Sequence, residues 1–264
     1  MNVLKFGIPT LIEAPSIEET TALCVSEGYD FVELNMNFPQ YCTEMPSADR
    51  IRAMAKENSI FYTLHLDENL NVCDFNPLVS EAYMQTVRDT IALAKDAMMP
   101  TINMHMARGV YITLPDRKVY LFDVRRDCYM KSLEALGKMC RELTSGSGVT
   151  MLIENTDGWQ PYEMEATEML LSYGFMLTFD IGHSHAVNDC DESFLLSHEN
   201  SLRHFHLHDG KDRSNHLTLG TGEIDLRGRI SLAQKHNCTC VVETKTVEAV
   251  KQSAQWLRSI GYMK

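Results

Sequence analysis

Several sequence features that mark particular classes of protein are missing from this chain. No stretch approaches the roughly 18 consecutive apolar residues of a membrane-spanning helix. The N-terminal segment, MNVLKFGIPTLIEAP, lacks the basic start, apolar core and small-residue cleavage site of a secretory signal peptide. We therefore expect a cytoplasmic protein that does not contact membranes.

Positive charge is scarce. The chain has 24 Lys and Arg residues against 36 Asp and Glu residues, which gives a formal net charge of −12, and it has no run of basic residues. Affinity for a phosphodiester backbone comes largely from cationic side chains, so this balance disfavours nucleic acid as a partner. A local basic groove or bound metal ions would weaken that argument.

Cysteine pairs with zinc-binding spacing are also absent. The eight cysteines include no CxxC pair, and Cys238 and Cys240 lie two positions apart in CTCVVET, which is the spacing of one strand face. Scattered cysteines in a cytoplasmic protein are typical of reduced thiols in the core. We therefore expect free thiols rather than a disulfide framework.

The chain does contain a regular alternation of short β-rich runs and longer amphipathic segments. Strands are predicted at residues 3–8, 31–36, 61–66, 101–106, 149–155, 175–180 and 238–244, with a histidine-rich seventh strand around residues 204–208. Helices are predicted at residues 16–27, 47–58, 78–97, 123–144, 163–172, 191–198, 225–236 and 247–260, and residues 108–121 form a longer connection.

This alternation predicts the fold class. Strand runs that are apolar on both faces indicate a parallel sheet covered by helices. Eight such units in about 250 residues favour a closed (β/α)₈ TIM barrel of the α/β class. The main alternative, a doubly wound sheet, would show a glycine-rich phosphate turn after its first strand, and FGIPTLIEAP contains none. No linker or low-complexity tract divides the chain, so residues 1–264 are predicted to form a single domain.

Ionisable residues end most of the predicted strands. In a barrel, the C-terminal ends of all strands meet at one mouth, where barrel enzymes place their chemistry. A single strand-end histidine is more often a satisfied core or rim residue, but six strands that all end this way indicate a functional site. The six residues are His65, His105, Glu154, Asp180, His206 and Glu243, and His183 follows Asp180 closely.

The histidine-rich strand belongs to the same pattern. On an extended strand, His204, His206 and His208 share one face, while Phe205 and Leu207 share the other. Buried imidazoles need partners, and a divalent cation is a partner that satisfies several at once. The alternative is a solvated edge strand with incidental histidines.

These side chains predict a metal site. Carboxylates from Glu154, Asp180 and Glu243, with the imidazole of His206, form a mixed set suited to Mn²⁺, Mg²⁺, Co²⁺ or Zn²⁺. Such a cluster of acidic groups would repel itself without a cation. Further metal positions are predicted for His65 and His105, which can share a second ion with Glu154, and for His183 and His216 as a third position.

Several motifs resemble the superfamily that unites endonuclease IV, sugar isomerases of the xylose-isomerase type, and sugar or sugar-phosphate epimerases. The similarity extends from His65 to Glu243, with the motifs in the expected order. They are IENTDG at residues 153–158, FDIGHSH at 179–185, HLHD at 206–209, HLTLGTGEI at 216–224 and VVETK at 241–245.

The resemblance implies specific roles for the strand-end residues. Glu154, Asp180, His206 and Glu243 match the shared metal site. His65 and His105 match the second metal position of the endonuclease-like branch, and His183 and His216 match histidines of the third. One departure stands out, because Ser214 occupies the place of an aspartate of that branch. The third position lacks its carboxylate unless Asp209 or Asp212 replaces it.

Our first functional hypothesis is a metal-dependent isomerase or epimerase for a small sugar or sugar phosphate. The metal would stabilise an enediolate, and Glu154 and Glu243 would remove a carbon-bound proton and return it. His183 is the third predicted catalytic residue. Substrate binding is assigned to His208, Lys211, Arg213 and Arg108, although the last three are equally compatible with solvated loop charges.

The alternative hypothesis is metal-dependent hydrolysis of a phosphate ester, including cleavage of DNA at abasic sites. His65 and His105 support it, whereas Ser214 and the net charge of −12 argue against it. Lyase chemistry on the same enediolate and a catalytically silent metal-binding barrel are further alternatives. The expected partner is a small carbohydrate, and the outer helices allow homo-oligomerisation, which no sequence feature fixes.

Overall fold

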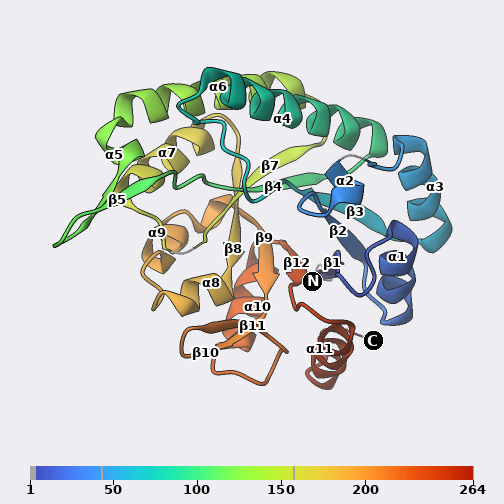
Figure 1. Cartoon of the computed structure of the whole chain (residues 1–264). Coiled ribbons are helices and arrows are strands. Elements are labelled where there is room, and N and C mark those ends of the chain that lie inside the picture. The colour runs from blue at the N-terminus through green and yellow to red at the C-terminus, as the bar shows by residue number, and fades with distance from the viewer. Residues whose placement is uncertain (1–3, 43, 157, 264) are drawn as a thin grey trace.

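The computed structural model describes residues 4–42, 44–156 and 158–263 (Figure 1). Val3 and Asp157, which belong to the first predicted strand and to the IENTDG motif, lie outside the described residues. Eight parallel strands form a closed barrel in the order β1-β12-β9-β8-β7-β4-β3-β2. Their bounds are β1 Lys5–Pro9, β2 Phe31–Asn35, β3 Phe61–His65, β4 Thr101–His105, β7 Thr150–Glu154, β8 Met176–Asp180, β9 Leu202–Leu207 and β12 Thr239–Val242. The predicted (β/α)₈ barrel is therefore confirmed.

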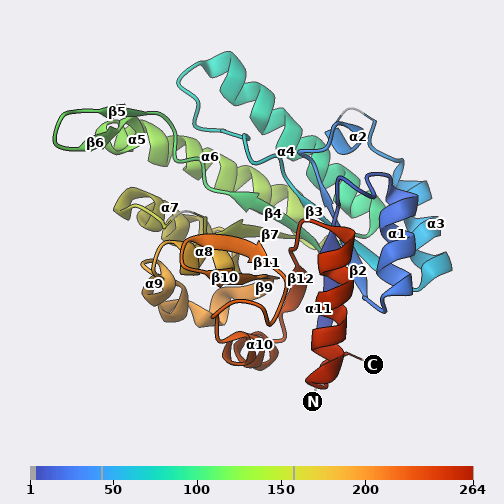
Figure 2. The ribbon, with the colours of Figure 1, turned by 60° about the horizontal axis from the view of Figure 1, so that its bottom comes forward.

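Helices surround the barrel (Figures 1 and 2). The longer ones are α1 Ile17–Ser26, α3 Ala48–Asn58, α4 Pro77–Ala97, α6 Arg126–Thr144, α7 Pro161–Ser172, α10 Leu226–Lys235 and α11 Val247–Ser259. Short helices are α2 Pro39–Cys42, α5 Leu121–Val124, α8 Ile181–Ala186 and α9 Glu192–Ser197, with a 3₁₀ turn at Glu199–Ser201. Figure 2 shows α11 beside α1, where the Tyr29 hydroxyl donates to the Val250 carbonyl at 3.0 Å. This contact ties the last helix to the first βα unit.

Side-chain caps explain where several helices begin. Ser16 forms a capping box with Glu19 at the start of α1, and Ser47 accepts a hydrogen bond from the Arg50 amide at the start of α3. Asn76 precedes α4, whose first residue is Pro77, and a proline is tolerated there because the first-turn amide lacks a helical partner anyway. These local signals account for helix starts within two residues of the sequence prediction.

Two connections contain hairpins, and one predicted helix contains a break, that the sequence prediction lacked. Residues 108–121 include an antiparallel hairpin of β5 Tyr111–Thr113 and β6 Lys118–Tyr120, which projects from the barrel at the left of Figure 1. Residues 209–217 form a second hairpin of β10 Asp209–Lys211 and β11 Ser214–Leu217. The predicted helix at 123–144 is interrupted at Arg125, whose ψ of 43° is not helical. Strands of three or four residues and a one-residue break are too short to give a periodic signal.

On β2 the inward-facing side chains change from apolar to polar along the strand. They run from Phe31 through Glu33 to Asn35, and the Phe31 ring stacks on Phe61 with ring centroids 4.7 Å apart. Gly7 leaves room for this ring, since a Cβ there would lie 2.5 Å from its atoms. The stacked Phe31 and Phe61 rings therefore lie toward the N-terminal end of the barrel, and Glu33 and Asn35 lie toward the C-terminal end.

All eight cysteines are free, as predicted. Among the residues described, none of the helices combines the length and the apolar character needed to cross a lipid bilayer.

Candidate active site

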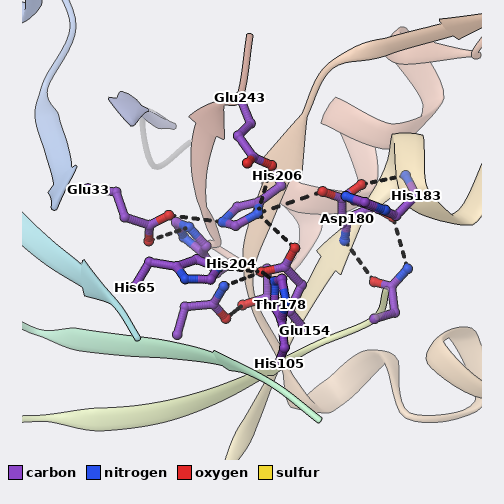
Figure 3. Close-up of polar contacts among 12 residues, drawn as sticks. Glu33, His65, His105, Glu154, Thr178, Asp180, His183, His204, His206 and Glu243 are labelled. Carbon is purple, nitrogen blue, oxygen red and sulfur yellow. Dashed lines mark hydrogen bonds and ion pairs between the residues drawn. The ribbon is translucent and has the colours of Figure 1, made fainter. Parts of the chain in front are cut away.

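Four side chains from neighbouring strands meet at the C-terminal mouth of the barrel (Figure 3). The Nδ1 atom of His206 lies 3.1 Å from Glu154 Oε1, 3.2 Å from Glu243 Oε2 and 3.7 Å from Asp180 Oδ2. Each of the four offers one ligand atom within 4.8 Å of the others. Glu154 and Asp180 end β7 and β8, and Glu243 directly follows β12. The structure thus brings together the four residues predicted as a shared metal site.

Unsatisfied polar atoms in this cluster fit a bound cation. His206 Nδ1 and Glu243 Oε2 are buried and have no hydrogen-bond partner among the described residues. Three carboxylates face one ring nitrogen, and burial of such groups is costly unless a positive charge compensates them. Three oxygen ligands and one nitrogen ligand suit Mn²⁺, Co²⁺, Mg²⁺ or Zn²⁺.

The electrostatics of the cluster agree with that fit. Burial alone would raise the pKa of Glu243, but the His206 charge and Lys245 hold this pKa well below its usual range. Burial likewise opposes ionisation of Asp180, yet the charges of His208 and His183 lower its pKa. The carboxylates are therefore ionised at neutral pH, the state that binds a metal.

Glu154 lies deeper in the barrel than Glu243 and contacts the second predicted metal position. Its Oε2 atom lies 3.1 Å from His65 Nε2 and 3.4 Å from His105 Nε2, and it also accepts a hydrogen bond from Asn103 Nδ2. The His65 Nδ1 atom lies 2.7 Å from the Leu66 carbonyl oxygen. His65, Glu154 and His206 form a second group of potential ligands, whereas His105 stands at its edge.

A third group contains His183, His208 and His216, whose ligand atoms lie within 4.8 Å of one another. His208, predicted to bind substrate, is fully buried, and its Nε2 atom lies 3.0 Å from Asp180 Oδ1. Its Nδ1 atom accepts a hydrogen bond from the His216 amide at 2.7 Å. Gly182 is needed here, because a Cβ would lie 2.0 Å from the His208 ring. His208 therefore supports Asp180 and the His216 segment.

Neither Asp209 nor Asp212, the two aspartates considered as replacements for the missing third-site carboxylate, joins these histidines. Asp212 is exposed and its amide donates to Glu223. The Asp209 carboxylate is buried and engaged with the loop that follows β11. It accepts hydrogen bonds from the amides of Gly210, Gly220, Gly222 and Ile224. The HLTLGTGEI motif thus forms a loop whose backbone amides surround and bind the Asp209 carboxylate.

Three cations predicted to bind substrate are not gathered at the cluster. The Arg108 guanidinium lies 3.3 Å from the buried Glu163 carboxylate and donates to the Gly158 carbonyl at 2.7 Å. Lys211 and Arg213 are exposed on the β10–β11 hairpin. Lys245 does reach the site, since its Nζ atom lies 2.8 Å from Glu243 Oε1.

A cavity opens beside Glu243. Its lining comes from the segments that follow β1, β2, β3 and β12, and includes Pro9, Thr10, Leu11, Ile12, Asn35, Asn37, Phe38, Glu68, Glu243 and Lys245. The Glu243 side chain is 13% exposed, against 2% for Glu154. Glu243 is therefore the carboxylate of the cluster that a small molecule reaches first.

Comparison with known proteins identifies the family. The family model described as a xylose isomerase-like TIM barrel matches residues 21–260. The chain belongs to the xylose isomerase-like TIM-barrel family. A relative in this comparison is an uncharacterised protein of Methanocaldococcus jannaschii, which is 26% identical over 235 residues, covering 84% of this chain and 81% of the relative.

Solved structures of similar fold include several epimerases. A D-tagatose 3-epimerase-like protein has a TM-score of 0.78 and 18% identity, with 97% of this chain and 96% of that chain covered. The 3-keto-D-glucoside 4-epimerase of E. coli has a TM-score of 0.75 and 17% identity, with 97% and 99% covered. An L-ribulose 3-epimerase has a TM-score of 0.75 and 15% identity, with 98% and 94% covered. At these identities the likeness establishes the fold of this family member.

Glu33 is the site residue that the sequence analysis missed. This β2 glutamate is 2% exposed and lies 3.0 Å, through Oε1, from His206 Nε2. Burial would raise the pKa of Glu33, but the His206 charge and hydrogen bonds with His204 and His206 lower it. The segment FVELN carried a usable signal, since Glu33 shares the inward face with Phe31 in the middle of a strand.

The buried His65–Glu154 pair predicts a pH-dependent stability of the metal-free protein. Burial opposes protonation of His65, but its hydrogen bond with Glu154 and the charge of that carboxylate raise its pKa from 6.5 to about 9. Because the folded-state pKa is raised, this stabilisation is complete below pH 6.5 and is lost as the pH rises through about 9. We expect the Tm to fall by at least ~3 °C over this window, since about 1 kcal/mol shifts the Tm by roughly 2–4 °C at this size.

The matched control is His65→Gln, which keeps a polar side chain but does not titrate. Thermal unfolding by circular dichroism, from pH 6 to pH 9.5, should show a smaller decline for the variant than for the natural chain. Parallel curves for the two proteins would contradict the raised pKa.

Proposed function

We propose that this protein is a divalent-metal-dependent isomerase or epimerase of a small sugar. The observation that carries the proposal is the pair of ionised carboxylates, Glu154 and Glu243, on two sides of the unpartnered His206 Nδ1 atom at the barrel mouth. The printed activities of the structural relatives, which include epimerases of tagatose, ribulose and a keto-glucoside, support the same class of reaction.

Glu154, Asp180, His206 and Glu243 would hold the metal. A divalent cation bound there supplies positive charge that polarises the carbonyl and hydroxyl oxygens of a sugar. Asp180 is held in place by His208 and by Asn155, which accepts a hydrogen bond from the Asp180 amide at 2.8 Å and donates one to its carbonyl at 2.9 Å. The chain thus orients a ligand set before substrate arrives.

Glu154 and Glu243 would carry out the proton transfer. Glu243 faces the cavity, and its lowered pKa makes it a carboxylate able to accept a proton from the carbon next to a carbonyl group. Glu154 approaches the cluster from the other side (Figure 3). Removal of a proton on one face and return on the other inverts a carbon, whereas return to the neighbouring carbon moves the carbonyl. Lys245, 2.8 Å from Glu243, orients this carboxylate.

The charges of the cavity favour an unphosphorylated sugar. Lys245 is the one cation among the described residues that line it, and this cation is already paired with Glu243. Glu68 adds a carboxylate to the same lining. A phosphate group there would face two acidic side chains and, among the described lining residues, no unpaired cationic side chain. Sugar hydroxyl groups, in contrast, can donate to Glu68 and accept from the Asn35 and Asn37 amides.

A second candidate is the phosphoesterase. The His65–Glu154 contact and the group formed by His183, His208 and His216 are the observations that favour it, because hydrolysis of phosphate esters often uses several metal ions. The scarcity of cations at the cavity and the net charge of −12 weigh against it.

Metal content and solvent-proton exchange test the proposed function together. Elemental mass spectrometry of protein purified without chelator should find about one Mn, Co or Mg per chain. Incubation with unphosphorylated ketoses in deuterium oxide should then place deuterium on the carbon beside the carbonyl. Two or three Zn per chain, with hydrolysis of phosphate diesters and no exchange on any ketose, would establish the second candidate instead.

A further inference from the structure

The Glu33 carboxylate is held by groups from two other strands. Its Oε1 atom lies 3.0 Å from His206 Nε2. Its Oε2 atom accepts a hydrogen bond from the Thr63 hydroxyl at 3.2 Å and lies 3.5 Å from His204 Nε2. His204 is itself anchored, since its Nδ1 atom lies 2.5 Å from the Thr239 hydroxyl. A buried carboxylate with this many neighbours has one orientation, and that orientation faces the His206 ring (Figure 3).

This contact determines which nitrogen of His206 is available. A neutral imidazole carries a proton on one nitrogen and a lone pair on the other, and an ionised carboxylate only accepts hydrogen bonds. Without a cation the ring carries a proton on both nitrogens and a positive charge. With a cation bound, the ring is neutral: its proton resides on Nε2, which donates to Glu33, and the Nδ1 lone pair faces the cation. Nδ1 is the atom that faces Glu154, Asp180 and Glu243 and lacks a hydrogen-bond partner.

We propose that Glu33 is a positioning residue, which holds His206 in the orientation and tautomer that leave Nδ1 free to bind a divalent cation at the barrel mouth. Glu33 does not line the cavity and acts only through His206. Groups that orient a metal-binding imidazole in this way commonly change metal affinity about 10- to 100-fold when mutated. The inference rests on the metal site of the proposed function, but not on the identity of the substrate.

Two variants test this role with Zn²⁺ as the probe. Glu33→Gln keeps the shape and an accepting oxygen but loses the charge, and Glu33→Leu removes the acceptor. Competition with a fluorescent chelator should give a Kd for Zn²⁺ about 10-fold higher for the first and about 100-fold higher for the second. In the Zn²⁺-loaded natural chain, long-range ¹H–¹⁵N NMR should show the His206 proton on Nε2. The glutamine variant should keep this signal and the leucine variant should lose it.

The matched control is Glu163→Gln, which changes another fully buried carboxylate that contacts Arg108 instead of the cluster. Its Kd for Zn²⁺ should stay within about 2-fold of the natural value. Folding of each variant is checked by circular dichroism, and if Glu33→Leu does not fold, the isosteric Glu33→Gln decides.

Unchanged Zn²⁺ affinity in a folded Glu33 variant would overturn the inference, as would a His206 proton found on Nδ1 in the loaded natural chain. A chain that binds Zn²⁺ through the expected tautomer but exchanges no sugar proton would contradict the proposed function and leave the role of Glu33 standing.

Discussion

Replacement of Glu243 by glutamine is expected to slow solvent-proton exchange on the sugar substrate by at least ~10³-fold, because general acid–base groups contribute roughly 10²- to 10⁴-fold. Glutamine retains an oxygen for a metal ion and for Lys245, but it cannot accept a proton at neutral pH. Glu243 is also the member of the cluster that faces the cavity. The measurement is deuterium incorporation by NMR on protein loaded with saturating Mn²⁺.

The control for this variant is Glu68→Gln, in the same cavity but outside the metal cluster. This change should weaken one hydrogen bond to the substrate and thereby raise the KM about 10-fold. The kcat should stay within a few-fold of the natural value. If Glu243→Gln exchanged protons at the natural rate while the metal stayed bound, Glu243 would not be the base.

Replacement of His206 by phenylalanine should cause the largest loss of stability. The imidazole separates the carboxylates of Glu33, Glu154 and Glu243, which lie 3.0, 3.1 and 3.2 Å from its nitrogens. Phenylalanine fills the same space but leaves these buried charges without a counter-charge. Removing one partner of a buried ion pair costs about 3–5 kcal/mol, so we expect the Tm of the metal-free variant to fall by roughly 10 °C. The same variant should also lose Zn²⁺ binding at the cluster, because the His206 ligand is missing.

His105→Phe is the matched control. His105 also contacts Glu154, but at 3.4 Å and with 18% of its side chain exposed. Its replacement should lower the Tm by only about 1–3 °C, since a partly exposed pair is screened by solvent. Equal losses for the two variants would indicate that ring packing, rather than compensation of charge, explains the role of His206.

The fold and the four central site residues were accessible to sequence reasoning for simple geometric reasons. A strand repeats every two residues, so a polar residue at the end of an apolar run has a defined face. In a parallel barrel all such ends lie at one mouth, which brings Glu154, Asp180, His206 and Glu243 together although 89 positions separate the first from the last. The seven strands with stated bounds were accordingly predicted to within two residues.

Sequence reasoning predicted less well the contacts of side chains that lie on loops. Arg108 was expected at the substrate, but its guanidinium contacts Glu163 on α7, a pairing that no local pattern encodes. Asp209 was considered as a metal ligand, but four loop amides occupy its carboxylate. Side chains on loops have no fixed direction relative to the chain, and their contacts depend on segments far away in the sequence.

The sequence by itself therefore determined the barrel, its mouth and the functional residues that lie there. Strand periodicity and the parallel order of the strands place all of these strand-end side chains at the C-terminal mouth. Only the tertiary structure decided the pairings: Glu33 with His206, His208 with Asp180, and Lys245 with Glu243. Each pairing joins groups on different elements over a few ångströms. Distances of that size follow from the twist and closure of the barrel and not from any local run of residues.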